Sequence, residues 1–136
     1  MTEPYRVLIT GSRSWKTIGA VRGALDEILR SLPDDQPLVV VHGDCPAGAD
    51  IMAKTWALTK LTPACTDDYE RVTEEAHPAA WHVHGRQAGF IRNADMVQLG
   101  ADLCLAFIRD GSRGASHTAR LAEQAGIPTR RFTEES

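Results

Sequence analysis

The sequence has no long hydrophobic run and no excess of positive charge. No stretch approaches the roughly 18 consecutive apolar residues of a membrane span, and the first ten residues do not combine a basic segment with an apolar one. We therefore expect a soluble protein. The formal net charge is −3, so the surface as a whole repels nucleic-acid phosphate. Binding to nucleic acid would therefore depend on a local basic patch. We do not expect nucleic acid to be the partner of this protein.

Cysteine is scarce and its spacing is uninformative. The odd number of cysteines and the lack of a CxxC pair favour a reducing, cytoplasmic setting, and the third cysteine lies within an apolar run, where a small buried thiol is common. The three cysteines are Cys45, Cys65 and Cys104. The sequence also lacks the G-x-G-x-x-G fingerprint and the GxxxxGK phosphate loop, which disfavours a conventional NAD enzyme or NTPase.

What the sequence does contain is a repeated unit of short apolar strand, glycine-containing loop and helix. At 136 residues, 43% of them apolar, the chain suits one domain over residues 1–136. The expected strands cover 6–10, 38–41, 62–66, 103–108 and 129–132, and the expected helices cover 17–31, 49–59 and 86–100. A fourth helix is expected after the turn at 110–114, and it ends at Gly126 and Pro128.

Strands that alternate with helices of this length predict a parallel sheet with helices on both faces. The fold class is therefore α/β, a Rossmann-like three-layer domain whose mostly parallel sheet has five strands in the order 3-2-1-4-5. In such sheets ligands bind beyond the carboxyl ends of the strands, where the strand order reverses.

The loop at 110–114, Asp-Gly-Ser-Arg-Gly, joins an apolar strand to a helix start. Backbone N–H groups without intrahelical partners, together with the positive end of the helix dipole, form a ready anion site. Arg113 would add charge, and Ser112 or Ser116 would cap the helix. The alternative is a tight turn that merely needs glycine.

A second Gly-Ser-Arg sequence, 11–13, stands in the same strand-to-helix context. With the expected strand order, both turns flank the switch point and face one crevice. A third loop, 42–50, contains Gly43, Asp44, Gly48 and Asp50. Asp50 is either a carboxylate favoured by the helix dipole or a partner for a ribose hydroxyl.

The pattern weakens between 62 and 85, which we expect to be an irregular loop or lid with a charged, solvated stretch at 67–75. His77, His82 and His84 give too few ligands for a metal site, so we expect them on the surface or in the lid. Trp81 would either stack on a base or pack the loop down.

The helix at 86–100 should turn Phe90, Ile91, Ala94 and Val97 inward. Arg92 and Asn93 then fall on another side of the helix, near its beginning. An arginine on a helix is usually solvated, so this pair is weak evidence when taken alone.

Four segments resemble the SLOG superfamily of Rossmann-like nucleotide-binding proteins, and within it the YspA-like branch. They are ITGSRSW, VVHGDCPAGADIMAKTWA, AGFIRNADM and DGSRGASHTARLAEQAGIP. The resemblance implies one Rossmann-like domain that binds a nucleotide or a nucleotide-derived ligand across these loops. It also implies that Arg92 and Asn93 point into the pocket.

The superfamily includes the LOG phosphoribohydrolases, whose motif is GGxGTxxE. In this sequence Ser112 stands at the second glycine, Ala115 at the threonine and Thr118 at the glutamate. Cleavage of a glycosidic bond needs a carboxylate, which Thr118 cannot supply. Asp44 or Asp50 could stand in, and His117 is either an acid–base candidate or a surface residue.

The leading hypothesis is a module that binds a nucleotide-like molecule as a sensor, sequestering protein or carrier, with no required cofactor and no metal. The alternatives are a nucleotide N-glycosidase that uses Asp44 or Asp50, and single-stranded nucleic-acid binding, as in the related protein DprA, with Trp15 or Trp81 stacking. Superfamily relatives commonly associate through helices, so a homo-oligomer stays open. The expected ligand-binding residues are Gly11, Ser12, Arg13, Trp15, Gly43, Asp44, Gly48, Asp50, Arg92, Asn93, Gly111, Ser112, Arg113, Gly114, Ala115 and Ser116.

Overall fold

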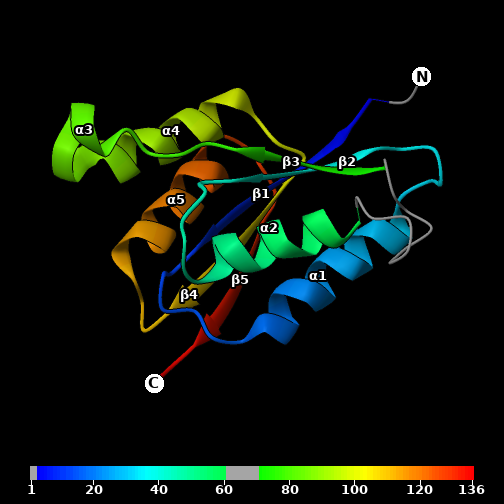
Figure 1. Ribbon diagram of the computed structural model, residues 1–136, viewed down its shortest axis with the longest axis horizontal. Coiled ribbons are helices and arrows are strands. Elements are labelled where there is room, and N and C mark those ends of the chain that lie inside the picture. The colour runs from blue at the N-terminus through cyan, green and yellow to red at the C-terminus, as the bar shows by residue number, and fades with distance from the viewer. Residues whose placement is uncertain (1–2, 61–70) are drawn as a thin grey trace.

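The computed structural model describes residues 3–60 and 71–136. They form a single α/β domain around a parallel five-stranded sheet in the order β3-β2-β1-β4-β5 (Figure 1), which confirms the expected fold class and strand order. The strands are β1 (Tyr5–Gly11), β2 (Leu38–His42), β3 (Val72–Ala76), β4 (Leu103–Arg109) and β5 (Thr129–Glu134).

Helices cover both faces of this sheet. One layer contains α1 and α2, and the other contains α4 and α5 (Figure 1). The helical elements are α1 (Ile18–Ser31), α2 (Ala49–Thr59), α3 (Trp81–His84), the 3₁₀ turn η1 (Gly85–Gln87), α4 (Ala88–Leu99) and α5 (Arg113–Gln124). No helix in the described part of the chain has the length and apolar character needed to cross a membrane.

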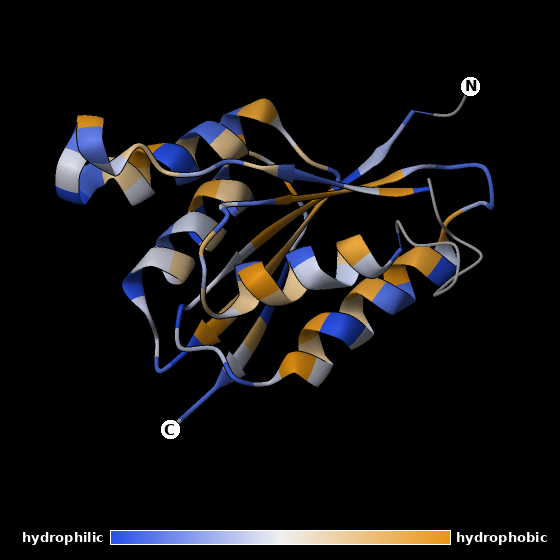
Figure 2. Cartoon of the chain, viewed as in Figure 1, coloured by the Kyte–Doolittle hydropathy of each residue, from blue (hydrophilic) through white to orange (hydrophobic). Residues whose placement is uncertain are grey.

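The middle parts of the central strands are apolar because both of their faces are covered, as the orange colour in Figure 2 shows. Val7 and Ile9 of β1 pack into the core beneath α1 and α2, whereas Leu8 packs into the core beneath α4 and α5. Neither face of strand β1 is therefore exposed to solvent. A ligand can reach β1 at its carboxyl end, where the loop to α1 begins.

The third strand of the sheet does not lie at 62–66, where the sequence pattern predicted it. Strand β3 runs over Val72–Ala76, within the stretch expected to be charged and solvated, while the strand expected at 62–66 lies outside the described residues. Val72 is fully buried. Glu74 accepts a hydrogen bond from His42 at 2.5 Å, and Glu75 forms an ion pair with Arg6 at 2.9 Å. These long-range partners, rather than an apolar pattern, make the segment a strand.

Two details of the helices also differ from expectation. In α4, Phe90 is 48% exposed and Ala94 is exposed, whereas Met96 is buried instead. The segment before α4, expected to be irregular, contains α3 and η1. Strand β5 extends two residues beyond the expected end at 132, to Glu134, whose carboxylate accepts a hydrogen bond from the Lys16 N–H at 2.7 Å.

Candidate functional site

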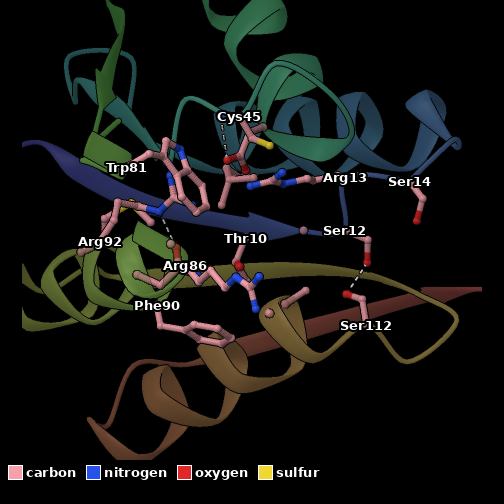
Figure 3. A pocket seen from close by; sticks show the side chains of 18 residues that line it. Thr10, Ser12, Arg13, Ser14, Cys45, Trp81, Arg86, Phe90, Arg92 and Ser112 are labelled. Carbon is pink, nitrogen blue, oxygen red and sulfur yellow. Dashed lines mark hydrogen bonds between the residues drawn. The ribbon is translucent and has the colours of Figure 1, made fainter. Parts of the chain in front are cut away.

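A cavity of about 420 Å³ opens at the carboxyl ends of β1 and β4, between the α2 side and the α4–α5 side of the sheet (Figure 3). This is the edge at which ligands bind in open parallel sheets, and the volume lies in the range of small-molecule sites. Its lining residues are Ile9, Thr10, Gly11, Ser12, Arg13, Ser14, Cys45, Asp50, Trp81, Arg86, Gly89, Phe90, Arg92, Asn93, Met96, Ser112, Gly114 and Ala115.

A pair of serine hydroxyl groups joins the two Gly-Ser-Arg turns. Ser12 Oγ lies 2.6 Å from Ser112 Oγ, and it also accepts a hydrogen bond from the Arg109 N–H at 2.8 Å (Figure 3). Since Ser12 Oγ accepts from the backbone of β4, it can donate its own proton to Ser112. The expectation that the two turns face one crevice is confirmed.

The start of α5 has open backbone donors. Ser112 occupies the N-cap position, as expected, but its side chain makes no capping hydrogen bond because its hydroxyl is paired with Ser12. The first N–H groups of a helix have no intrahelical acceptor, and Gly114 and Ala115, in the first turn, line the cavity. Here the partial positive charge of a helix start faces the cavity.

Gly48 supports the site from outside the cavity. Its φ is +80°, and a Cβ there would overlap with the Ser12 carbonyl oxygen and lie 2.8 Å from Arg13 Cα. Because Gly48 has no side chain, the loop after β2 can pack in direct contact with the loop after β1. Gly48 was expected to contact ligand, but it does not line the cavity, because the main chain of Ser12 and Arg13 covers it.

Among residues 3–60 and 71–136, Asp50 alone places a carboxylate in the cavity wall. It is 7% exposed, and its Oδ2 accepts a hydrogen bond from the Cys45 N–H at 3.3 Å, which closes the loop in front of α2. Burial raises the pKa of Asp50. Asp44, the other acidic candidate, pairs with Lys54 at 3.0 Å and does not line the cavity.

Arg92 links three parts of the structure. Its guanidinium donates to the carbonyl oxygens of Gly43 and His77 and, through Nε, to Asn93 Oδ1 at 2.6 Å. Burial lowers its pKa, and the charge of Asp50 partly offsets this. A Cβ on Gly43 would lie 2.5 Å from the Arg92 guanidinium, so this glycine makes room for Arg92 rather than for a ligand.

Nine lining residues were absent from the expected ligand-binding residues, and three of them contribute side chains from the segment between β3 and the middle of α4. Trp81 comes from α3, Arg86 from η1 and Phe90 from α4. Arg86 is exposed and forms no ion pair with any described residue. Trp81 was considered as a stacking residue in the sequence analysis. Phe90 was missed because its spacing in the helix predicted that it would be buried in the core.

Several expected residues lie outside the cavity. Trp15 is 3% exposed and packs against Phe107 with ring centroids 5.3 Å apart, so it cannot stack on a base. His117 packs its ring edge-on against Phe90 at 5.7 Å. Besides Gly43, Asp44 and Gly48, the remaining expected residues outside the cavity are Gly111, Arg113 and Ser116, which lie at the turn and on the first part of α5. Within residues 3–60 and 71–136, no three His, Cys, Asp or Glu side chains group as metal ligands do.

Comparison with known families supplies the classification. The family model described as YspA, cpYpsA-related SLOG family matches residues 5–84, which is more than half of the chain. The chain belongs to this SLOG family. The matched SLOG segment begins at β1 and ends with α3, so it includes Ser12, Gly48, Asp50 and Trp81.

A relative of this SLOG protein occurs in Mycobacterium phage D29, where it is named Gene 61 protein. The two sequences are 46% identical over 127 residues, which cover 93% of this chain and 95% of the phage protein. No solved structure matches the chain significantly.

Proposed function

We propose that this protein binds a nucleotide or a nucleotide-derived phosphate compound in the cavity, as a sensor, sequestering protein or carrier. Membership of the SLOG family supports a nucleotide-related role. The observation that carries the proposal is the Ser12–Ser112 contact, because it brings the β1 loop to the uncapped start of α5. In this arrangement the N–H groups of Gly114 and Ala115 are available to phosphate oxygens.

The charges around the cavity support a ligand with about two negative charges. Arg13, Arg86 and Arg92 line it together with Asp50. The charge of Asp50 offsets that of Arg92, which is also held by backbone carbonyls. Arg13 and Arg86 have no ion pair with a described residue. Neither guanidinium group is therefore neutralised by a described carboxylate, and both can make charge-assisted, bidentate contacts with phosphate.

Thermal-shift screening with nucleoside phosphates, ADP-ribose and cyclic nucleotides should reveal a stabilising ligand, and calorimetry should then give its affinity. We expect Arg86→Ala to weaken binding about tenfold or more, because a hydrogen bond to a charged group contributes about 1.5–3 kcal/mol. Arg120→Ala is the matched control, since Arg120 is exposed on α5 and does not line the cavity. If no compound shifts the melting temperature of a folded sample, or if both variants bind equally well, the proposal fails.

A second candidate function is hydrolysis of a nucleotide N-glycosidic bond with Asp50 as the acid–base group. It is favoured by one observation, which is that the Asp50 carboxyl group lines the cavity, is buried and has a raised pKa. Thr118 is buried and donates to the Gly114 carbonyl oxygen at 2.9 Å, so it takes no part. Chromatography should detect free base after incubation with mononucleotides, and Asp50→Asn should abolish its release. A wild-type protein that binds nucleotide without releasing base would exclude this function.

A further inference from the structure

Trp81 differs from the other two tryptophans of the chain. Trp15 and Trp56 are each 3% exposed and belong to the core, whereas Trp81 is 48% exposed at the cavity wall. Burying an indole ring is strongly favourable, so a half-exposed ring beside a cavity leaves apolar surface for a ligand to cover. Phe90 lines the cavity on the side next to α5 (Figure 3) and is also 48% exposed.

The Trp81 ring is held in place and its face is covered by a cation. The edge of its six-membered ring lies against the start of α4, where a Cβ added to Gly89 would be 3.4 Å from Trp81 Cη2. The Arg13 guanidinium lies over the ring, 5.3 Å from its centroid (Figure 3). This contact joins the loop after β1 to α3, across the mouth of the cavity.

We propose that the ligand carries a purine or pyrimidine ring that stacks on Trp81 in the place of the Arg13 guanidinium, while Arg13 turns to the phosphate. This inference rests on the proposed function and specifies the class of ligand. A cation over an aromatic ring at an exposed site is a weak contact, and stacking of a base on an aromatic side chain is stronger. The exchange also gives Arg13 a charge-assisted hydrogen bond, so both steps favour the bound state.

The test compares ligands with and without a base. Calorimetry should show that at least one of the four common 5′-mononucleotides binds the wild-type protein about tenfold more tightly than ribose 5-phosphate does. Trp81→Leu should remove that preference and leave ribose 5-phosphate binding unchanged or tighter, because Arg13 is released from the ring. Trp81→Phe should keep most of the preference. Val83→Ala is the matched control, since Val83 is 64% exposed on the same helix and does not line the cavity.

Fluorescence of the wild-type protein provides a second readout that does not depend on a variant. The exposed Trp81 should be quenched by the preferred mononucleotide but not by ribose 5-phosphate. Equal affinities of the wild-type protein for mononucleotides and for ribose 5-phosphate would overturn the stacking inference and leave the phosphate site intact. The same conclusion would follow if Trp81→Leu weakened the binding of mononucleotides and of ribose 5-phosphate by the same factor. If neither kind of compound binds, the proposed function and this inference fall together.

Discussion

Replacing Gly48 with alanine should strongly destabilise the fold. Gly48 adopts φ 80° and ψ −148°, a region that is nearly restricted to glycine and costs other residues about 1–3 kcal/mol. The added methyl group would also overlap with the Ser12 carbonyl oxygen and lie 2.8 Å from Arg13 Cα, and overpacking of this kind costs about 1–3 kcal/mol. Together these costs amount to about 2–6 kcal/mol.

Guanidinium chloride unfolding, followed by circular dichroism, measures this loss directly. Gly23→Ala is the matched control, because Gly23 is an exposed residue within α1 and a Cβ there meets nothing within 4 Å. Alanine at that position should stabilise the protein by about 0.5–1 kcal/mol. The reasoning is refuted if Gly48→Ala unfolds at the wild-type denaturant concentration, or if Gly23→Ala is the less stable of the two variants.

Two further predictions concern the loops and the edge of the sheet. Ser12→Ala should lower the free energy of unfolding by about 1–3 kcal/mol, because it leaves the Arg109 N–H without its acceptor. Ser112→Ala should lower it by less in the same unfolding assay, and equal losses in the two variants would contradict this prediction. Arg6 and His77 lower the pKa of Glu75 from 4.5 to about 2, so the ionised carboxylate stabilises the fold above pH 4.5 and this contribution is lost as the pH falls through about 2. The stability difference between wild type and Glu75→Gln should shrink over that interval, and a difference that stays constant with pH would be inconsistent with the ion pair. The effect should be small, because the Glu75 side chain is 36% exposed.

The central part of the fold could be predicted from sequence because its physical signals are local. Continuous apolar runs such as 103–108 indicate strands buried on both faces, and the alternation of strand and helix predicts a parallel topology. Strand β3 could not be found in this way. Its sequence, VTEEA, contains one fully buried apolar residue, Val72, and its two glutamates depend on His42 and Arg6, which lie far away in the chain.

The site was predicted in outline and misassigned in detail for a related reason. Glycines in the loops after β1 and β2 do mark the close approach of other groups, whereas a Cβ at Gly111 or Gly114 would meet nothing within 4 Å. Where another group does approach, the sequence does not say which group it is. At Gly43 it is the Arg92 side chain, and at Gly48 it is the main chain of Ser12 and Arg13. Trp81 reaches the cavity from α3 and Arg86 reaches it from η1. These two elements are too short to show a hydrophobic periodicity from which the direction of their side chains could be predicted.

The central claim is that the β1 loop, the start of α5 and Trp81 surround one ligand site. Nuclear magnetic resonance of the nitrogen-15-labelled protein, titrated with the tightest-binding mononucleotide, tests it most directly. We expect saturable shifts that are largest at the amides of Ser12, Arg13, Gly114 and Ala115 and at the Trp81 indole N–H. Shifts confined to the groove between the carboxyl ends of α4 and α5, which Val97, Gly100 and Gly126 line, would contradict the account, as would the absence of any saturable shift.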